Sequence, residues 1–149
     1  MLGKTHLLFG LFVSLLGLVF FDLTHPLTFV VLVLFGSLFP DVDEPNSYLG
    51  RKVKIIGKLF KHRGFFHSVF ALALFSWIIY LLMGDMLYVL GFAVGFLTHL
   101  VLDVVTLAGV KSWPLPHFRG GIKVGGLIEM VFFWVLVVAN GWLLVMGGL

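Results

Sequence analysis

The chain has 149 residues, of which 60% are apolar and only 11% are charged, and its mean hydropathy is +1.13. Soluble domains carry charge on about a quarter of their residues, so this composition excludes an ordinary soluble domain and indicates a protein embedded in lipid. The absence of cysteine excludes disulfides and thiolate ligands, so any metal ion must be held by imidazole and carboxylate groups.

Apolar segments predict an all-α fold, an integral membrane bundle of about five transmembrane helices in a single domain over residues 1–149. The second segment is shorter than the roughly 20 residues of a full span and stops at Pro40, so we expect it to be thin or tilted. The first is interpreted as a helix and not as a signal peptide, because no small-residue cleavage site follows it. The predicted helices cover residues 5–22, 27–39, 65–83, 86–107 and 126–146.

Lysine and arginine positions indicate how the bundle is oriented. Five spans place all 10 of them in the N-terminal segment, the 40–64 loop and the 108–125 loop, which share one side of the membrane. By the positive-inside rule this side is cytoplasmic, which predicts a cytoplasmic N-terminus and a multi-pass protein of the inner (cytoplasmic) membrane. The basic stretch at about 51–61 is predicted to form an amphipathic surface helix on anionic lipid head groups.

Metal-type side chains gather at the cytoplasmic ends of four predicted helices. This convergence does not follow from the apolar pattern or from the Lys and Arg count, so it is an independent indication of a membrane-embedded metal site. The candidate metal ligands are His6, Asp41, Asp43, His62, His67, His99 and Asp103.

His99 and Asp103 are four residues apart, so on a helix they lie on one face about a turn from each other and can hold one ion. The alternative interpretation is an interhelical hydrogen bond. Asp41 and Asp43 lie between two prolines, and in extended backbone alternate side chains point the same way, so both are expected to bind metal or to divide into ligand and base. The alternative there is a polar turn that caps a helix end.

His62, Arg63 and His67 place two imidazoles and a guanidinium at a helix start. The guanidinium forms a planar fork that suits a phosphate or a carboxylate. Simple interfacial anchoring is the alternative, but paired histidines rarely serve it. His6 is interpreted as a ligand or a hydrogen-bond partner of one. His117 and Glu129 are held in reserve as ligands, with His117 expected in solvent and Glu129 near the start of the last helix.

These motifs resemble the YdjM/DUF457 family of membrane-bound, metal-dependent hydrolases. The resemblance runs from residue 5 to about 114 and implies a metal-assisted hydrolase activity in the membrane. More distantly, the chain is similar to the helical zinc phospholipase C and P1 nuclease group. The motifs are Thr5-His6, Pro40-Asp41-x-Asp43, His62-Arg63-Gly64-x-x-His67-Ser68, His99-x-x-x-Asp103 with Thr106 and Gly109, and Trp113-Pro114.

The residues lead to the hypothesis of a membrane-bound metal-dependent hydrolase that cleaves a phosphoester of a lipid or lipid-linked substrate at the cytoplasmic leaflet. One or two divalent ions, zinc or alternatively manganese, would activate water. Asp41 or Asp43 would serve as base, and Arg63 would neutralise phosphate charge. The expected partners are that substrate and anionic lipid head groups.

Two other function classes fit the sequence less well. A non-catalytic metal-binding membrane protein or small cation carrier would need polar residues through the bilayer, and the outer halves of the predicted helices are almost bare of them. Nucleic-acid binding by residues 51–63 ranks last, because the basic residues there alternate with lipid-facing ones and lack a soluble aromatic face.

Overall fold

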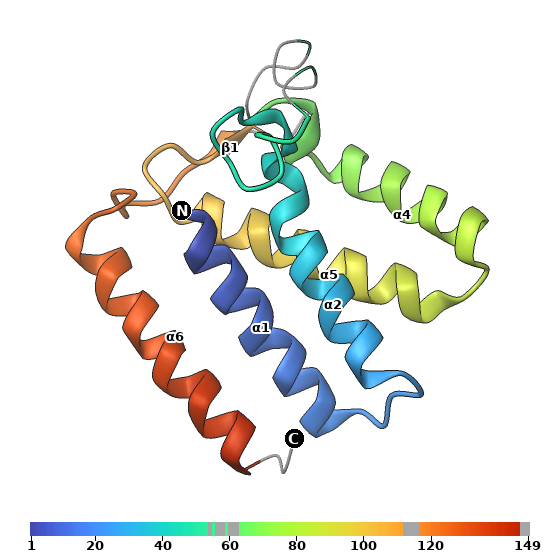
Figure 1. Cartoon of the computed structure of the whole chain (residues 1–149). Helices are drawn as coiled ribbons and strands as arrows, with labels where there is room; N and C mark the ends of the chain where they lie inside the picture. The colour runs from blue at the N-terminus through green and yellow to red at the C-terminus, as the bar shows by residue number, and fades with distance from the viewer. Residues whose placement is uncertain (54, 56–58, 60–62, 112–116, 147–149) are drawn as a thin grey trace.

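The computed structural model describes residues 1–53, 55, 59, 63–111 and 117–146. His62 and most of the predicted surface helix at 51–61 lie outside these ranges, as do Trp113 and Pro114. Within them most residues are helical and almost none lie in strands, which confirms the predicted all-α fold class (Figure 1). The helices are α1 Gly3–Phe20, α2 Pro26–Leu38, α4 Val69–Met83, α5 Met86–Val104 and α6 Leu127–Met146, with 3-10 helices η1 Phe39–Asp43 and η2 Phe65–His67. Strands β1 Val110–Lys111 and β2 His117–Phe118 pair antiparallel.

Four segments of the described chain are long and apolar enough to cross a membrane: α1, Pro26–Asp43, α5 and α6. The second span is longer than predicted, because helical backbone does not stop at Pro40. Proline needs no amide hydrogen bond in the first turn of a helix, so α2 continues directly into η1. The apolar helix α4 has 15 residues and is shorter than a full span.

The predicted third helix is divided at Ser68. Phe65–His67 form a 3-10 turn, after which Ser68 is extended and its hydroxyl accepts a hydrogen bond from the Ala71 amide at 3.0 Å. This is the usual N-cap arrangement, so α4 begins at Val69. His67 is thereby held in a turn and not on the face of a helix. The fourth helix ends at Val104, three residues before the predicted boundary.

Helices α2 and α5 pack closely enough to exclude side chains at their crossing. A Cβ at Gly95 would lie 2.0 Å from the Val33 carbonyl oxygen, and one at Gly36 would lie 2.3 Å from that of Phe92. Glycine at both positions therefore permits a backbone-to-backbone approach. Aromatic residues fill the space beside it, with Phe39 packed edge-on against Phe75 and Phe92.

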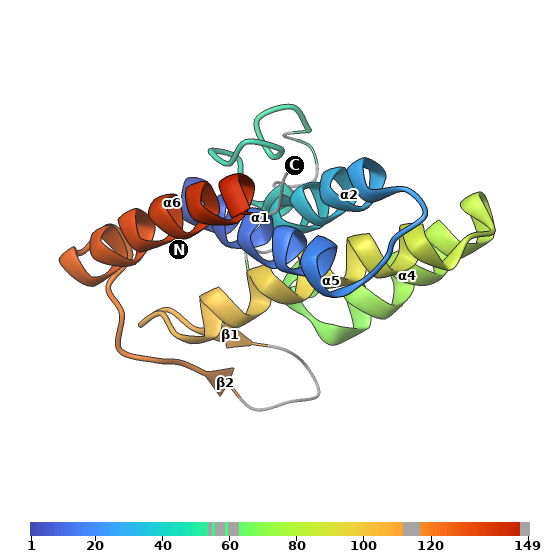
Figure 2. The same cartoon turned by 90° about the horizontal axis from the view of Figure 1, so that it is seen from below.

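Helix α1 lies between α2 and α6, and α4 lies alongside α5 on the other side of the bundle (Figures 1 and 2). A buried side-chain amide joins α6 to α1. Asn140 of α6 donates a hydrogen bond to the Leu8 carbonyl oxygen of α1 at 3.1 Å. The N-terminus, η1, η2 and the strands gather at one end of the bundle (Figure 1). The segments that carry the described lysines and arginines are therefore together, as the charge count predicts.

Candidate metal centre

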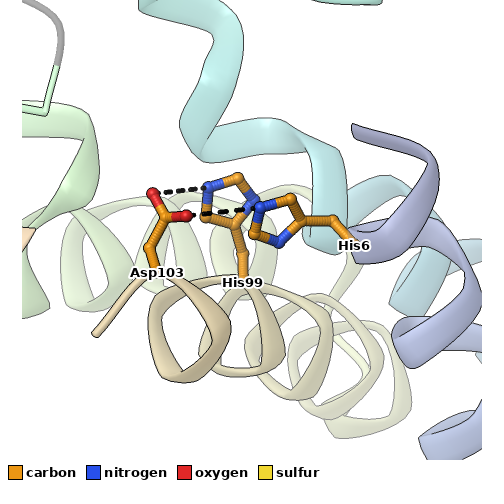
Figure 3. A group of neighbouring side chains, drawn as sticks. All are labelled: His6, His99 and Asp103. Atoms are coloured by element: carbon orange, nitrogen blue, oxygen red, sulfur yellow. Dashed lines mark ion pairs between the residues drawn. The ribbon is translucent and has the colours of Figure 1, made fainter. Parts of the chain in front are cut away.

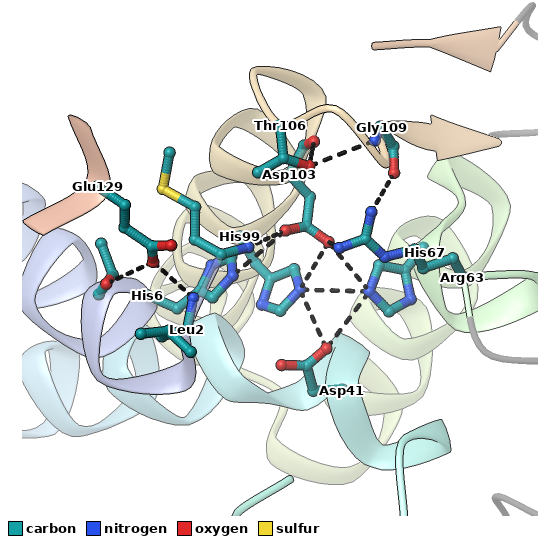
Figure 4. Close-up of polar contacts among 12 residues, drawn as sticks. Leu2, His6, Asp41, Arg63, His67, His99, Asp103, Thr106, Gly109 and Glu129 are labelled. Carbon is teal, nitrogen blue, oxygen red and sulfur yellow. Dashed lines mark hydrogen bonds and ion pairs between the residues drawn. The ribbon is translucent and has the colours of Figure 1, made fainter. Parts of the chain in front are cut away.

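Six of the seven predicted ligands meet at this end of the bundle. They come from α1 (His6), η1 (Asp41 and Asp43), η2 (His67) and α5 (His99 and Asp103), and five of them are shown in Figure 4. All are buried except Asp41, which is half-buried. His62 lies outside the described residues.

Four of these side chains form a cage, which we define as His67, His99, Asp41 and Asp103. The two Nε2 atoms are 3.3 Å apart. Asp41 Oδ1 lies 3.5 Å from His67 Nε2 and 3.6 Å from His99 Nε2, while Asp103 Oδ2 lies 3.6 and 3.8 Å from the same two atoms. A tetrahedral zinc site with bonds of 2.0–2.1 Å has ligand-to-ligand edges of about 3.4 Å. The ligand atoms of Asp41, His67 and His99 all lie within 4.8 Å of one another, so these three side chains could hold one metal ion, with Asp103 on the other side of the imidazole pair.

Hydrogen bonds behind the cage orient both imidazoles. His99 Nδ1 lies 2.7 Å from the Ser37 carbonyl oxygen, which can only accept, so Nδ1 carries the proton and Nε2 offers its lone pair to the cage. His67 Nδ1 faces Asp43 Oδ2 at 3.7 Å. Asp43 thus lies behind His67, in the position of a carboxylate that orients a metal-binding histidine.

His6 lies beside the cage and forms a second group of possible ligands with His99 and Asp103 (Figure 3). Its ring stacks on that of His99, with centroids 3.8 Å apart, and its Nε2 lies 3.4 Å from Asp103 Oδ1. Within the described part of the chain, neither ring nitrogen of His6 makes a hydrogen bond. A buried imidazole in this state is stabilised by a cation that binds its lone pair.

Asp103 connects the cage to two positive groups. Its Oδ1 contacts the buried amino group of Met1, and its Oδ2 lies 3.2 Å from Arg63 Nη2. Arg63 also donates from Nη1 to the Gly109 carbonyl oxygen at 2.8 Å. The backbone of Arg63 has φ +60, a conformation that costs a non-glycine residue roughly 1–2 kcal/mol. Arg63 is therefore held against the cage from two sides.

The protonation of His67 depends on its carboxylate neighbours. Burial alone would lower the pKa of His67, but hydrogen bonds to Asp41 and Asp43 and the negative charge of both outweigh burial and raise this pKa to about 9. At neutral pH the metal-free centre therefore holds a proton on His67, and a bound cation must displace it.

A pocket of about 590 Å³ opens onto the cage beside Asp41 and Arg63. Asp41 is the cage residue that lines it, so water and a ligand reach the centre from this side. Three basic side chains surround the opening. They are Lys4, Arg51 and Arg63.

The two reserve ligands lie away from the cage. Glu129 accepts hydrogen bonds from the Leu2 amide at 2.6 Å, the Thr5 hydroxyl at 2.8 Å and the Gly125 amide at 2.7 Å, so it joins the starts of α6 and α1 (Figure 4). Its position as the first acid of an apolar helix is a sequence signal for such a role. His117 is exposed, with Nε2 3.1 Å from the Ala108 carbonyl oxygen. The contact of Ser37 with His99 could not be predicted from the sequence, because it is made by the backbone carbonyl of Ser37 and not by its side chain.

Comparisons with known proteins agree with this architecture. A family model described as YdjM inner membrane protein matches residues 1–147. The chain is 34% identical to Inner membrane protein YdjM of Escherichia coli (strain K12), over 71% of this chain and 61% of that protein, and equally to the protein of that name in Shigella flexneri. It is 30% identical to Uncharacterized protein YvsG of Bacillus subtilis (strain 168), over 74% of this chain and 71% of that protein.

No solved structure matches the chain. The chain spans about three fifths of the length of the two YdjM relatives. The family match over nearly all of the sequence, together with four helices able to cross a membrane, shows that the chain belongs to the YdjM family of multi-pass inner membrane proteins.

Proposed function

We propose that this protein is a membrane-bound hydrolase that uses a divalent metal ion, zinc in the first place, to cleave a phosphoester of a lipid or lipid-linked substrate at the cytoplasmic leaflet. The observation that carries the proposal is the cage of two imidazoles and two carboxylates, in which both carboxylates lie 3.5–3.8 Å from the two Nε2 atoms. Two nitrogen and two oxygen donors suit zinc, and they also suit manganese.

The four corners of the cage differ in their access to the pocket. His67, His99 and Asp103 are fully buried, so we assign them to metal binding, with His6 beside Asp103 as a further ligand or support. These residues would hold a divalent ion, whose chemistry would be to lower the pKa of a water ligand towards about 7 and so to supply a nucleophile near neutral pH.

Asp41 and Arg63 are the groups that reach the pocket. Asp41 occupies the corner that lines it, so its carboxylate is placed to accept a proton from attacking water. Arg63 holds its guanidinium next to Asp103, where it would neutralise the charge of a phosphate. Asp43, which faces His67 from outside the cage, would orient that imidazole and keep its Nε2 directed inward.

The test is metal content together with activity. The protein would be purified in mild detergent, as wild type and as His99→Ala, with His25→Ala as the matched control because His25 is exposed at the start of α2, outside the cage. We expect stoichiometric zinc or manganese, by elemental mass spectrometry, in the wild type and in His25→Ala, and none in His99→Ala. Hydrolysis of phosphodiester and phospholipid substrates should follow the bound metal.

Three outcomes contradict the proposal. Wild-type protein without metal after supplementation, or full metal content in His99→Ala, would remove the metal centre. Stoichiometric metal without cleavage of any phosphoester would leave a metal-binding membrane protein with no hydrolase activity.

A further inference from the structure

Three cavities follow one another from the metal centre to the outer side of α1. The first is the pocket at Asp41 and Arg63. The second, of about 280 Å³, lies between the starts of α1 and α6 and shares Leu2 and Lys4 with the first. The third, of about 710 Å³, shares Met130 and Trp134 with the second. The three cavities are therefore neighbours that follow one another from the cage to the membrane-facing side of α6.

We call the third cavity the α1–α6 groove. Apolar and aromatic side chains line it, with Phe12 on α1 and a stripe on α6 that recurs every four residues from Met130 to Trp142. This stripe is about 18 Å long at 1.5 Å per residue, slightly more than half of a hydrocarbon core about 30 Å thick. It begins next to Glu129, which is bonded to the start of α1. The groove therefore extends from the site through about one leaflet.

Among the described residues, the basic side chains that line these cavities lie at the polar end of the series. Lys4 is exposed, lines both the first and the second cavity, and has its Nζ 4.8 Å from the centre of the Phe133 ring. Arg51 and Arg63 line the first cavity, where the carboxylates of Asp41 and Glu44 also lie. Cations beside a polar pocket, followed by an uncharged groove of leaflet depth, match the order of phosphate and acyl chain in an anionic lipid.

We propose that the substrate is an anionic long-chain phospholipid that enters sideways between α1 and α6, with its phosphate beside Arg63 and Lys4 and one acyl chain in the α1–α6 groove. The inference that this lipid is cleaved rests on the proposed function, whereas its position in the groove does not. Bulk lipid covers a smooth helix face evenly. A groove that continues into a charged pocket retains one lipid in one orientation.

A photoreactive lipid tests this position. Wild-type protein would be placed in phosphatidylcholine vesicles with a small fraction of phosphatidic acid that carries a photoreactive group midway along one acyl chain. Mass spectrometry would then locate the labelled residues. We expect labels to concentrate on Phe12 and on Met130–Leu143, above the level on the exposed side of α4. A photoreactive diacylglycerol, which lacks the phosphate, should label α4 and α6 alike.

Filling the groove supplies the matched variants. Ala139→Trp and Val138→Trp both add a bulky ring inside the groove. Two positions are used because the test needs only one variant that folds and retains its metal. Either should lower labelling of α6 to the level on α4. Ala73→Trp, on the exposed side of α4, should leave the labelling of α6 unchanged. None of the three positions contacts the cage, so metal content should equal that of the wild type.

Other outcomes separate this inference from the proposed function. Equal labelling of α4 and α6 by the phosphatidic acid probe would overturn it, and so would α6 crosslinks to a second copy of the chain in place of lipid. Groove labelling without phosphoester cleavage would support the lipid position and contradict only the hydrolase. Cleavage of a soluble phosphoester, without preferential labelling of the groove by the lipid probe, would support the hydrolase and contradict only the lipid position.

Discussion

Asp41 and Asp43 show what can and cannot be predicted at the scale of a residue. Both were predicted to point the same way, because alternate side chains of extended backbone do so. In the structure they lie in η1, where each residue turns by about 120°, so only Asp41 faces both imidazoles of the cage and Asp43 lies behind His67. The residue types were therefore predictable, but their division into cage and support required the backbone conformation.

The raised pKa of His67 predicts that rising pH lowers the stability of the metal-free protein and raises its affinity for zinc. Protonated His67 stabilises the metal-free fold fully below its unfolded pKa of 6.5, and this contribution is lost as pH rises through about 9. Metal must displace that proton, so zinc affinity should rise about tenfold per pH unit up to about pH 9.

Thermal denaturation in detergent, with and without zinc, measures both effects. The denaturation temperature of the metal-free protein should decrease as pH rises from 6.5 to 9. The increase in that temperature caused by a fixed zinc concentration should become larger over the same interval. Zinc stabilisation that stays constant across this range would show that His67 gives up no proton to the metal.

At the scale of an element, the site depends on how closely α2 and α5 approach each other. The Ser37 carbonyl that orients His99 belongs to the end of α2, and the glycine contacts at Gly36 and Gly95 set its distance from α5. The lengths of the helices were largely predictable from apolar runs. Their crossing was not, because a glycine in an apolar segment fits both a close contact and an ordinary lipid-facing position.

Gly95→Ala tests this dependence. The new Cβ would meet the Val33 carbonyl oxygen at 2.0 Å and the Ser37 amide nitrogen at 2.8 Å, so α2 must move away from His99. We expect a lower denaturation midpoint and weaker zinc binding. Gly141→Ala is the matched control, since nothing lies within 4 Å of a Cβ there and alanine favours helix by up to about 1 kcal/mol. Equal zinc affinity in both variants would contradict the proposed dependence.

At the scale of the whole molecule, the order of the apolar helices was the most predictable property, since it rests on the length of the apolar runs. The start of α4 after Ser68 was harder to predict, because apolar residues lie on both sides of this N-cap residue. Convergence of the ligands was predicted from where each motif lies relative to the helix ends, which neither the apolar runs nor the basic residues determine. Helix ends on one side of a membrane lie in one thin layer, so polar side chains at these ends are already confined to a small volume.

The orientation is a prediction that the lack of cysteine makes simple to test, because any introduced thiol is unique. Asp85→Cys lies in the turn between α4 and α5, and Arg119→Cys lies in the loop before α6. A membrane-impermeant maleimide added to intact spheroplasts should label Asp85→Cys directly and Arg119→Cys only after permeabilisation. The opposite pattern would place the metal centre on the periplasmic side.

The separation of the ligands along the chain has a consequence for biosynthesis. His6 leaves the ribosome 97 residues before Asp103, an interval of about 5–20 s at 5–20 residues per second. During that time His6, and later the acids of η1, lack their partners on α5. A metal ion that needs ligands from all of these segments would therefore bind only after α5 has been inserted, later than the helices that carry the first ligands.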